Sequence, residues 1–307
     1  MTIAILGIGG VGGYFGGLLA ERYHGADDVR VIFITKPATG EIIRRDGLRI
    51  ITDDGERTVH PAAVVSDTEE LAPLDVLICA TKSYDLVAAL APLASSLSER
   101  TLILPLLNGV DAGDRIRALH PDAITLDGCV NVNAQRTAPG VIRKSGAIEK
   151  LFFGSPDAPA ERLAALHRIF LDAGIDAHLS DDIASDIWTK FLLNAGMASA
   201  TSHFDETIGA LLADPAHRAV LTSLVGEAHR IAVAKGIVLP DDIVARTIEK
   251  MEALPYDGTS SMHRDYRSGG PTEYRSLSKY VADAGDALGI DTPTFDAIIP
   301  DLARRAG

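Results

Sequence analysis

The chain has 307 residues, a formal net charge of −13 and 47% hydrophobic residues. This length usually requires more than one domain, and the composition is that of an ordinary globular protein. The excess of negative charge argues against a nucleic acid partner, because most of the surface would repel its phosphates. The two cysteines, Cys79 and Cys129, form no disulfide framework and lack metal-ligand spacing, so we expect a cytoplasmic protein without a metal site.

An uncharged run covers residues 3–20 and is long enough to suggest a membrane span or a signal peptide. No Lys or Arg precedes the run, so the basic segment of a signal peptide is missing. Seven of its residues are glycine, which weakens a helix. We therefore expect no membrane segment.

Short apolar runs and helical patterns alternate through the first half of the chain. The expected strands cover residues 2–6, 29–34, 74–80 and 101–107. The first expected helix follows the glycine run at residues 7–12 and extends through Ala20, and the others cover residues 84–97, 111–119 and 158–173. A Pro139-Gly140 turn within residues 133–153 indicates a hairpin or late strands. Strands that alternate with helices predict an α/β fold, a Rossmann-type doubly wound parallel sheet over residues 1–181.

The pattern becomes almost entirely helical near Asp181. No strand alternation follows, and no repeat of solenoid period is present. We expect an all-α C-terminal domain over residues 182–307, joined to the first by a polar linker around residues 179–182. Its helices are expected at residues 182–200, 205–213, 215–235, 241–251, 272–288 and 294–305.

A glycine fingerprint follows the first expected strand and opens a helix, with the sequence Gly7-Ile8-Gly9-Gly10-Val11-Gly12. In a dinucleotide-binding loop, Gly7 permits the tight turn, Gly9 lets backbone N–H groups approach a pyrophosphate, and Gly12 lets the helix pack closely on the sheet. The helix N-terminus adds partial positive charge for the phosphates. The alternative is a glycine-rich turn that binds no ligand.

The residue after the second strand decides which dinucleotide binds. The chain reads Ile34-Thr35-Lys36 there, with no acid to bind a ribose 2′-hydroxyl. Lys36 is the candidate partner of a 2′-phosphate, which favours NADPH. The alternative is an ordinary solvated loop lysine.

Polar residues follow two further expected strands at their carboxyl ends, where ligands bind in open α/β sheets. Lys82 follows residues 74–80, and Asn108 follows residues 101–107. Both could reach a cofactor or substrate. Taken alone, Lys82 could equally be a solvated lysine at a helix start, and Asn108-Gly109 an ordinary turn pair.

Lys190 and Asn194 are four residues apart in a helical pattern and so share one helix face. Their neighbours are mostly apolar, which predicts partial burial. Burial disfavours the charged form of an amine and lowers its pKa, so that a lysine can donate a proton near neutral pH. The equal alternative is a lysine whose stem packs on the core while its head reaches solvent.

Two further candidates lie near the C-terminal end of the chain. Pro271 is a plausible first-turn residue, which would place Glu273 at a helix N-terminus. Ser261 lies upstream in Thr259-Ser260-Ser261-Met262. Without other information, Glu273 could simply favour the helix start, and Ser261 could be a loop serine.

Taken together, these motifs resemble the ketopantoate reductases (2-dehydropantoate 2-reductases) along nearly the whole chain. The order and spacing of the motifs carry the resemblance, because each motif taken singly is not specific for the family. The matching pieces are the glycine loop, a basic Lys36, Thr81-Lys82, Asn108-Gly109, Trp188-Thr189-Lys190 with Asn194, Ser260-Ser261-Met262, Asp265 and Thr272-Glu273.

The resemblance implies NADPH-dependent reduction of 2-dehydropantoate, or of a closely related 2-oxo acid, in pantothenate biosynthesis. NADP(H) would be held by Gly7, Gly9, Gly10, Val11, Gly12, Lys36, Lys82 and Asn108. Lys190 would be the general acid, and Glu273 would hold the substrate's hydroxyl end or position Lys190. Asn108, Asn194 and Ser261 would orient the substrate by hydrogen bonds. In this family the active site lies between the two domains.

The chain departs from the family pattern one turn beyond Asn194. An asparagine followed by a proline is frequent there, whereas this chain has Ala198 and Ser199. An alanine side chain cannot hydrogen-bond a substrate hydroxyl, although Ser199, Thr201 or Ser202 could compensate. The exact 2-oxo acid is therefore left open by the sequence.

Two other functions remain compatible with the sequence. One is an NADP(H)-dependent dehydrogenase of another Rossmann-plus-helical family, and the other is a sensor that binds NADP(H) without chemistry. The pairing of Lys190 with Asn194 argues against a sensor, which needs no proton donor. Dimerisation through the helical domain is compatible with its apolar helix faces.

Overall fold

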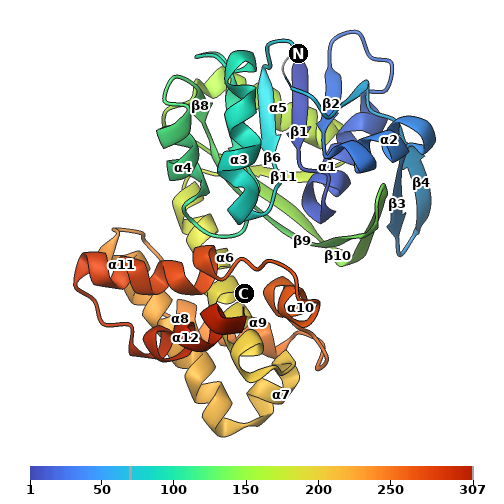
Figure 1. Cartoon of the computed structure of the whole chain (residues 1–307). Coiled ribbons are helices and arrows are strands. Elements are labelled where there is room, and N and C mark those ends of the chain that lie inside the picture. Colours follow the sequence, from blue (N-terminus) through green and yellow to red (C-terminus); the bar gives the residue numbers. More distant parts are fainter. Residues whose placement is uncertain (69–70, 306–307) are drawn as a thin grey trace. The chain divides into compact units, whose positions relative to one another are not determined.

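The computed structural model describes residues 1–68 and 71–305 (Figure 1). It divides into two compact units. The first comprises Met1–Leu107 and Asp111–Ile183, and the second comprises Asn108–Val110 and the chain from Ala184 onward. A single boundary at residue 181 does not describe this division, because Asn108–Val110 group with the helical unit although they lie far upstream in sequence.

The first unit is built on a six-stranded sheet whose neighbouring strands are all parallel, which confirms the predicted doubly wound fold. The strand order is β5-β2-β1-β6-β7-β8, so the order reverses between β1 and β6. Ligands of such sheets bind beyond the carboxyl ends of the strands at this point of reversal. The strands are β1 (Thr2–Leu6), β2 (Arg30–Ile34), β5 (Ala63–Val65), β6 (Val76–Cys79), β7 (Leu102–Pro105) and β8 (Ile124–Thr125).

The side chains of β1 alternate between two apolar cores, as the period of a strand requires. Ile3 and Ile5 enter the core shared with helix α1 (Gly10–Arg22), whereas Ala4 and Leu6 enter the core on the other face. Helices α3 (Leu86–Leu90) and α4 (Ala112–Leu119) cover that second face. Because both faces are covered, the central strands β1, β2, β6 and β7 are almost entirely apolar, and this made these four recognisable in the sequence.

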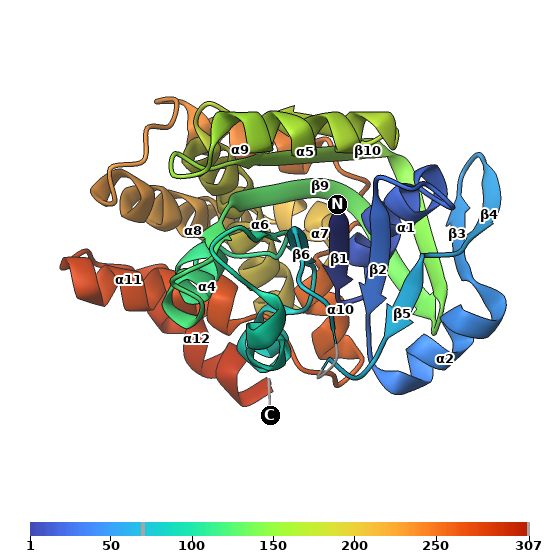
Figure 2. The same ribbon diagram turned by 90° about the horizontal axis from the view of Figure 1, so that it is seen from above.

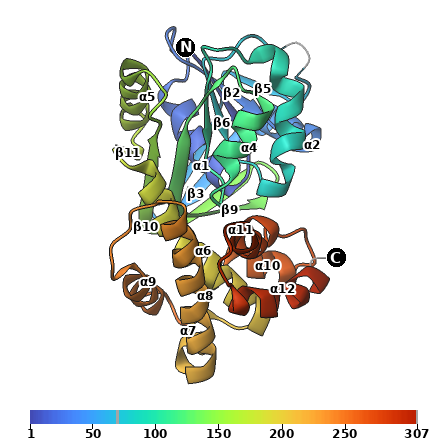
Figure 3. The ribbon, with the colours of Figure 1, turned by 90° about the vertical axis from the view of Figure 1, so that its left-hand side faces the viewer.

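A second, five-stranded sheet packs on the other side of α1 (Figure 2). Its long strands β9 (Asp127–Ala138) and β10 (Val141–Gly154) form the hairpin predicted around Pro139-Gly140. Parallel strands β3 (Leu48–Thr52) and β11 (Asp176–Leu179) flank β10, and β4 (Gly55–Val59) pairs with β3. Helix α5 (Ala160–Asp172) contacts β11 and completes this core (Figure 3).

The position of α1 between two sheets explains the uncharged run at residues 3–20. A Cβ at Gly16 would lie 2.9 Å from Ile5 of the first sheet, and a Cβ at Gly17 would lie 2.3 Å from Ile50 of the second. A helix enclosed on both sides is apolar all round and tolerates no large side chain at the closest contacts. Within residues 1–68 and 71–305, no helix has the length and hydropathy needed to cross a bilayer.

Several elements differ from the sequence predictions. The helix expected over residues 84–97 is divided into a 3-10 turn (Ser83–Asp85), α3 and a second 3-10 segment (Ala91–Ser96). Pro92 explains the break, because it lacks the N–H that continues an α-helix. Helix α2 (Pro37–Asp46) and strands β3 to β5 were not predicted. β4 is exposed at four of its five residues, so it shows no apolar alternation.

The described residues of the second unit have no regular element other than helices, which confirms the predicted helical character. Their inward faces form one core that includes α6 residues Trp188, Phe191 and Leu192. The helices are α6 (Ile183–Phe204), α7 (Ile208–Ala213), α8 (Pro215–Ala234), α9 (Ile243–Glu252), α10 (Ser261–Arg267), α11 (Tyr280–Leu288) and α12 (Pro293–Arg305), with a π-helical turn at Arg275–Lys279.

A buried carboxylate from α8 caps the start of α12. Glu227 is 2% exposed, and its two carboxylate oxygens accept hydrogen bonds from Thr294 N at 2.9 Å and Phe295 N at 3.0 Å. These N–H groups have no partner within their own helix, and a negative charge at this end also interacts favourably with the helix dipole. Glu227 therefore joins two helices of the core.

Replacing Glu227 by glutamine is expected to lower the free energy of unfolding by about 1–3 kcal/mol, because the amide retains only one acceptor oxygen and no charge. Glu249→Gln, at an exposed position of α9, is the matched control and should change stability by less than about 0.5 kcal/mol. Chemical denaturation of the two variants measures the difference. Equal stabilities would show that the cap is not a significant stabilising contact.

Candidate active site

Asn108 belongs to a short turn that groups with the helical unit. It follows β7, and the next residue, Gly109, has φ +97°. Glycine adopts this conformation without the steric cost that a Cβ brings. Val110 then packs against the core of the helical unit. The turn therefore holds Asn108 against the helical unit, which also contains Lys190, Asn194 and Glu273.

Helix α6 carries Lys190 and Asn194 on a face that is less buried than the face of its core contacts. Trp188 and Phe191 are buried in the core and pack edge to face, with ring centroids 5.2 Å apart. Lys190 and Asn194 are only partly buried. Their shared helix face was predicted from the spacing of four residues.

The amide of Asn108 connects three side chains from distant parts of the sequence. Its Oδ1 accepts hydrogen bonds from Lys190 Nζ at 3.1 Å and from Asn194 Nδ2 at 3.4 Å. Its Nδ2 donates to Glu273 Oε2 at 3.4 Å. The amide oxygen therefore faces two donors and the amide nitrogen faces a carboxylate, so each contact has matching polarity. We refer to Asn108, Lys190, Asn194 and Glu273 as the Asn108 cluster.

Glu273 lies just before a helical turn, close to the helix N-terminus that the sequence predicted, and its carbonyl oxygen accepts hydrogen bonds from Ser276 N and Leu277 N, both at 3.1 Å. Pro271, Thr272 and Glu273 are not helical, and the π-helical turn begins at Arg275. Thr272 and Glu273 are 8% and 3% exposed, whereas a solvated first turn would leave them accessible. The main chain of Glu273 thus begins the helical turn, while its buried carboxylate contacts Asn108. π-helical turns are frequent beside functional sites.

Ser261 is the first residue of α10 and not a loop residue. It is partly buried, and among the described residues its hydroxyl makes no hydrogen bond to the Asn108 cluster. The preceding Ser260 caps α10, since its Oγ accepts a hydrogen bond from His263 N at 3.0 Å. The Ser261 hydroxyl therefore has no part in capping the helix.

The glycine loop connects β1 to α1 in the first unit, as predicted. Gly7 has φ +93°, and a Cβ at Gly12 would lie 2.1 Å from Gly7 O. Apart from the local backbone, no atom of the described residues lies within 4 Å of a Cβ built at Gly9, so space is open there. At Gly10 a Cβ would lie 2.1 Å from Ala134 O of β9, so this glycine is also required for packing. Val11 follows in the first turn of α1.

The loop has the properties of an anion site. Among the described residues no side chain caps the N-terminus of α1, and the first turn of this helix contains no acid. Its N–H groups and the helix dipole are therefore available to a phosphate. The residues present thus fit the pyrophosphate of a dinucleotide.

Two lysines of the first unit lie at strand ends. Lys36 is exposed, two residues beyond β2 and directly before α2. Lys82 is partly buried beyond β6. Beside it, the Oγ1 atom of Thr81 is buried and has no hydrogen-bond partner among the described residues. Thr81 was not predicted as a cofactor contact, because a threonine after a strand carries no distinctive signal. Its free hydroxyl at the point of strand reversal makes it a further candidate for that role.

The residues around Ala198 show which hydroxyls could replace the asparagine that is frequent in the family. Ala198 is 3% exposed. Ser199 Oγ hydrogen-bonds Ser278 Oγ at 2.7 Å, and Thr201 Oγ1 donates to Met197 O at 2.7 Å. Among the described residues, Ser202 Oγ is buried without a partner. Ser199 and Thr201 therefore already use their hydroxyls inside the helical unit.

A parallel sheet with a glycine loop between its first strand and first helix is typical of proteins that bind a dinucleotide. The chain belongs to the ketopantoate reductase family: the model "Ketopantoate reductase PanE/ApbA" matches residues 3–158, and its C-terminal counterpart matches residues 182–304. Membership confirms the resemblance found in the sequence. The protein is therefore an oxidoreductase.

Individual relatives cover the whole chain. The 2-dehydropantoate 2-reductase of Porphyromonas gingivalis W83 is 32% identical, with a TM-score of 0.85 and 99% of each chain covered. That of Halobacterium salinarum is 28% identical over 306 residues, covering 100% of this chain and 99% of its own. A D-mandelate dehydrogenase, solved with NADH and anilino(oxo)acetate, shares the fold with a TM-score of 0.87 at 23% identity, covering 100% of this chain and 98% of its own.

Proposed function

We propose that the protein reduces 2-dehydropantoate, or a closely related 2-oxo acid, to the 2-hydroxy acid with NADPH. The observation that carries the proposal is the convergence of Lys190 Nζ and the Asn194 amide on Asn108 Oδ1, beside the buried carboxylate of Glu273. This arrangement holds an amine ready to give a proton to a carbonyl oxygen. As proposed, the reaction takes place in the cytoplasm and belongs to pantothenate biosynthesis.

The glycine loop, Lys36 and Lys82 are the residues we propose for the dinucleotide. The N–H groups at the start of α1 would bind the pyrophosphate, with Gly9 leaving room for its approach. Lys36 would bind the 2′-phosphate, and Lys82 and Asn108 would contact the cofactor near its reacting end. When bound, NADPH supplies the hydride that reduces the ketone.

In the proposed reaction, Lys190 is the general acid. Its Nζ donates a proton to the substrate oxygen as the carbonyl becomes a hydroxyl, so that hydride and proton together complete the reduction. Glu273 accepts a hydrogen bond from the Asn108 amide and thereby keeps Asn108 Oδ1 directed at Lys190. Asn194 and Ser261 would hold the substrate by hydrogen bonds.

An assay of NADPH oxidation with 2-dehydropantoate and a panel of other 2-oxo acids tests the proposal. We expect turnover with at least one of them and higher kcat/KM for NADPH than for NADH. Tight NADPH binding without oxidation by any acid of the panel would contradict the proposal and favour a sensor. Preference for an acid with an apolar end would fit the buried methyl of Ala198.

Replacing Lys36 by alanine is expected to lower kcat/KM for NADPH roughly tenfold or more while leaving NADH almost unchanged, because a charge-assisted contact to the 2′-phosphate is lost. Steady-state kinetics with both cofactors measure this. Lys150→Ala, an exposed lysine of β10, is the control for the loss of one surface charge. An equal effect of Lys36→Ala on both cofactors would contradict the assignment of Lys36 to the 2′-phosphate.

A further inference from the structure

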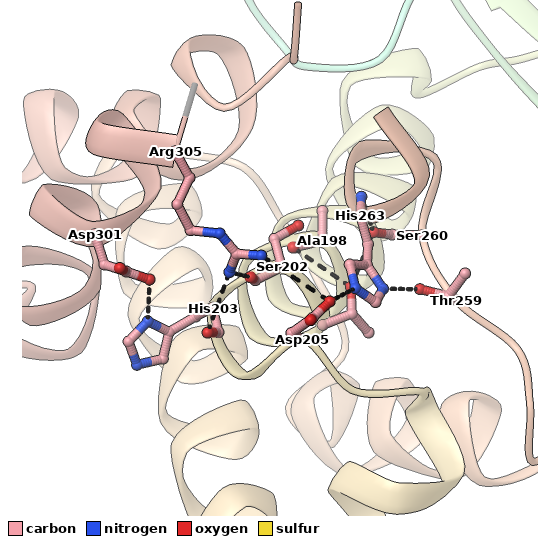
Figure 4. A network of polar contacts seen from close by, with 10 residues as sticks. Ala198, Ser202, His203, Asp205, Thr259, Ser260, His263, Asp301 and Arg305 are labelled. Atoms are coloured by element: carbon pink, nitrogen blue, oxygen red, sulfur yellow. Dashed lines mark hydrogen bonds and ion pairs between the residues drawn. The ribbon is translucent and has the colours of Figure 1, made fainter. Parts of the chain in front are cut away.

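A buried histidine anchors α10 to the end of α6 (Figure 4). His263 is 1% exposed, and both of its ring nitrogens are hydrogen-bonded. Nδ1 contacts Thr259 Oγ1 at 2.5 Å, and Nε2 contacts Asp205 Oδ1 at 2.7 Å. Thr259 immediately precedes the cap of α10, and Asp205 follows the last residue of α6. The imidazole therefore bridges the two helices.

Asp205 is held in the conformation that this bridge needs. Its φ is +56°. Among the described residues, it is the only non-glycine residue with a positive φ. Its carboxylate also lies 4.0 Å from Arg305 of α12, whose guanidinium donates to Ser202 O (Figure 4). The hydrogen bond from His263 holds the pKa of Asp205 below its usual value. A backbone conformation with a steric cost persists where surrounding contacts fix it.

A second contact joins the same helices at the cap of α10. Ser260 Oγ lies 2.9 Å from Thr201 Oγ1 of α6 and also accepts the hydrogen bond from His263 N. The start of α10 is thus fixed to α6 by a hydroxyl pair and by the imidazole bridge. Met262 and Tyr266 bury beside His263 in the helical core.

Ser261 and His263 lie on nearly opposite sides of α10. Two residues correspond to a rotation of about 200° around a helix axis. Because His263 is buried against Asp205 and Thr259, the partly buried Ser261 points to the other side. A rotation of α10 that moved one side chain would move the other equally.

We propose that His263 and Asp205 are positioning residues, which fix the rotation of α10 and so direct the Ser261 hydroxyl toward the substrate. The proposal rests on the substrate contact that the proposed function gives to Ser261. Neither residue touches the reacting atoms. Their loss is expected to weaken substrate binding while the proton donor Lys190 remains in place.

Asp205 is the residue to change first, because its side chain is 55% exposed and its loss leaves the core intact. Asp205→Gly removes the hydrogen-bond partner of His263 Nε2, and glycine tolerates the positive φ. We expect KM for the reduced 2-oxo acid to rise roughly three- to tenfold, the effect of one hydrogen bond, with kcat almost unchanged. Asp205→Asn keeps an acceptor oxygen and also tolerates the positive φ, so it should restore most of the affinity.

His217→Ala is the matched control. His217 Nδ1 lies 2.9 Å from Glu206 Oε2, and its ring stacks on Phe204 near the same end of α6. Within the described part of the chain, its hydrogen bonds and ring contacts do not involve α10. It should leave KM unchanged. A rise in KM equal to that of Asp205→Gly would overturn the proposal, because general loosening of the region would then explain both.

A double-mutant cycle with Ser261→Ala tests whether Asp205 acts through Ser261. If it does, Asp205→Gly adds nothing to KM in the Ser261→Ala background, whereas additive effects would overturn the proposal. Hydrogen exchange of a peptide covering residues 259–268 gives a readout without substrate. We expect faster exchange in Asp205→Gly than in His217→Ala, and equal exchange would overturn the anchoring role. If the wild type reduces no 2-oxo acid, the proposed function fails, and the exchange comparison still decides whether Asp205 anchors α10.

Discussion

Replacement of Lys190 by alanine is expected to lower kcat by roughly 10²–10⁴, the usual contribution of a general acid. The amine donates to Asn108 Oδ1 at 3.1 Å and extends from a helix anchored by Trp188 and Phe191. Its removal leaves the rest of the Asn108 cluster in place. Binding of NADPH, measured by fluorescence titration, should be almost unchanged.

A second variant of Lys190 separates the loss of the proton donor from the loss of positive charge, and a surface lysine provides the control. Lys190→Arg keeps the positive charge but holds its protons too tightly to donate them, so its kcat should be nearly as low as that of Lys190→Ala. Lys250→Ala, at an exposed position of α9, should behave as the wild type. Turnover that survives in Lys190→Ala would exclude Lys190 as the proton donor.

Replacement of Gly12 by alanine is expected to destabilise the first unit severely. The new Cβ would lie 2.1 Å from Gly7 O and 2.9 Å from Ala80 Cβ. The first of these neighbours is backbone and cannot rotate away, and α1 is enclosed between two sheets. We expect the free energy of unfolding to fall by about 3 kcal/mol or more, measured by chemical denaturation.

Two other glycines provide the comparison. Gly9→Ala introduces a methyl group into open space at φ −94°, so stability should be preserved while dinucleotide affinity falls. Gly226→Ala, within α8 and with no atom of the described residues near its Cβ, should stabilise the protein by about 0.5–1 kcal/mol. Unchanged stability of Gly12→Ala would show that α1 can move away from the sheet. Unchanged affinity of Gly9→Ala would remove the loop from the cofactor site.

The strands that the sequence predicted correctly are those that are buried on both faces and therefore form short apolar runs. β1 was placed correctly at residues 2–6, and β2, β6 and β7 each lie within the expected ranges, because they are apolar on both faces. The exposed strand β4 and the short helix α2 carried no such signal. The second sheet was missed apart from its hairpin, because parallel pairing of β10 with β3 and β11 joins segments far apart in sequence.

The candidate site was predictable only where its residues are near in sequence. The spacing of Lys190 and Asn194 placed both on one face of α6, but nothing local indicated that they meet Asn108, which precedes them by 82 and 86 residues. The resemblance to the family brought these residues together before the structure did. Pro271 indicated the helix start beside Glu273, but the burial of the Glu273 side chain was not predicted, because it depends on tertiary contacts such as the one from Asn108.

The grouping of Asn108–Val110 with the helical unit has a consequence for chimeric proteins. Joining two homologues at residue 183 would combine the helices of one parent with the Asn108 turn of the other. Val110 would then have to fill a cavity that evolved for a different side chain, and any misfit would displace the amide that Lys190 contacts. A functional hybrid therefore requires these three residues to be inherited together with the helices, as a separate insertion into the first parent's sequence.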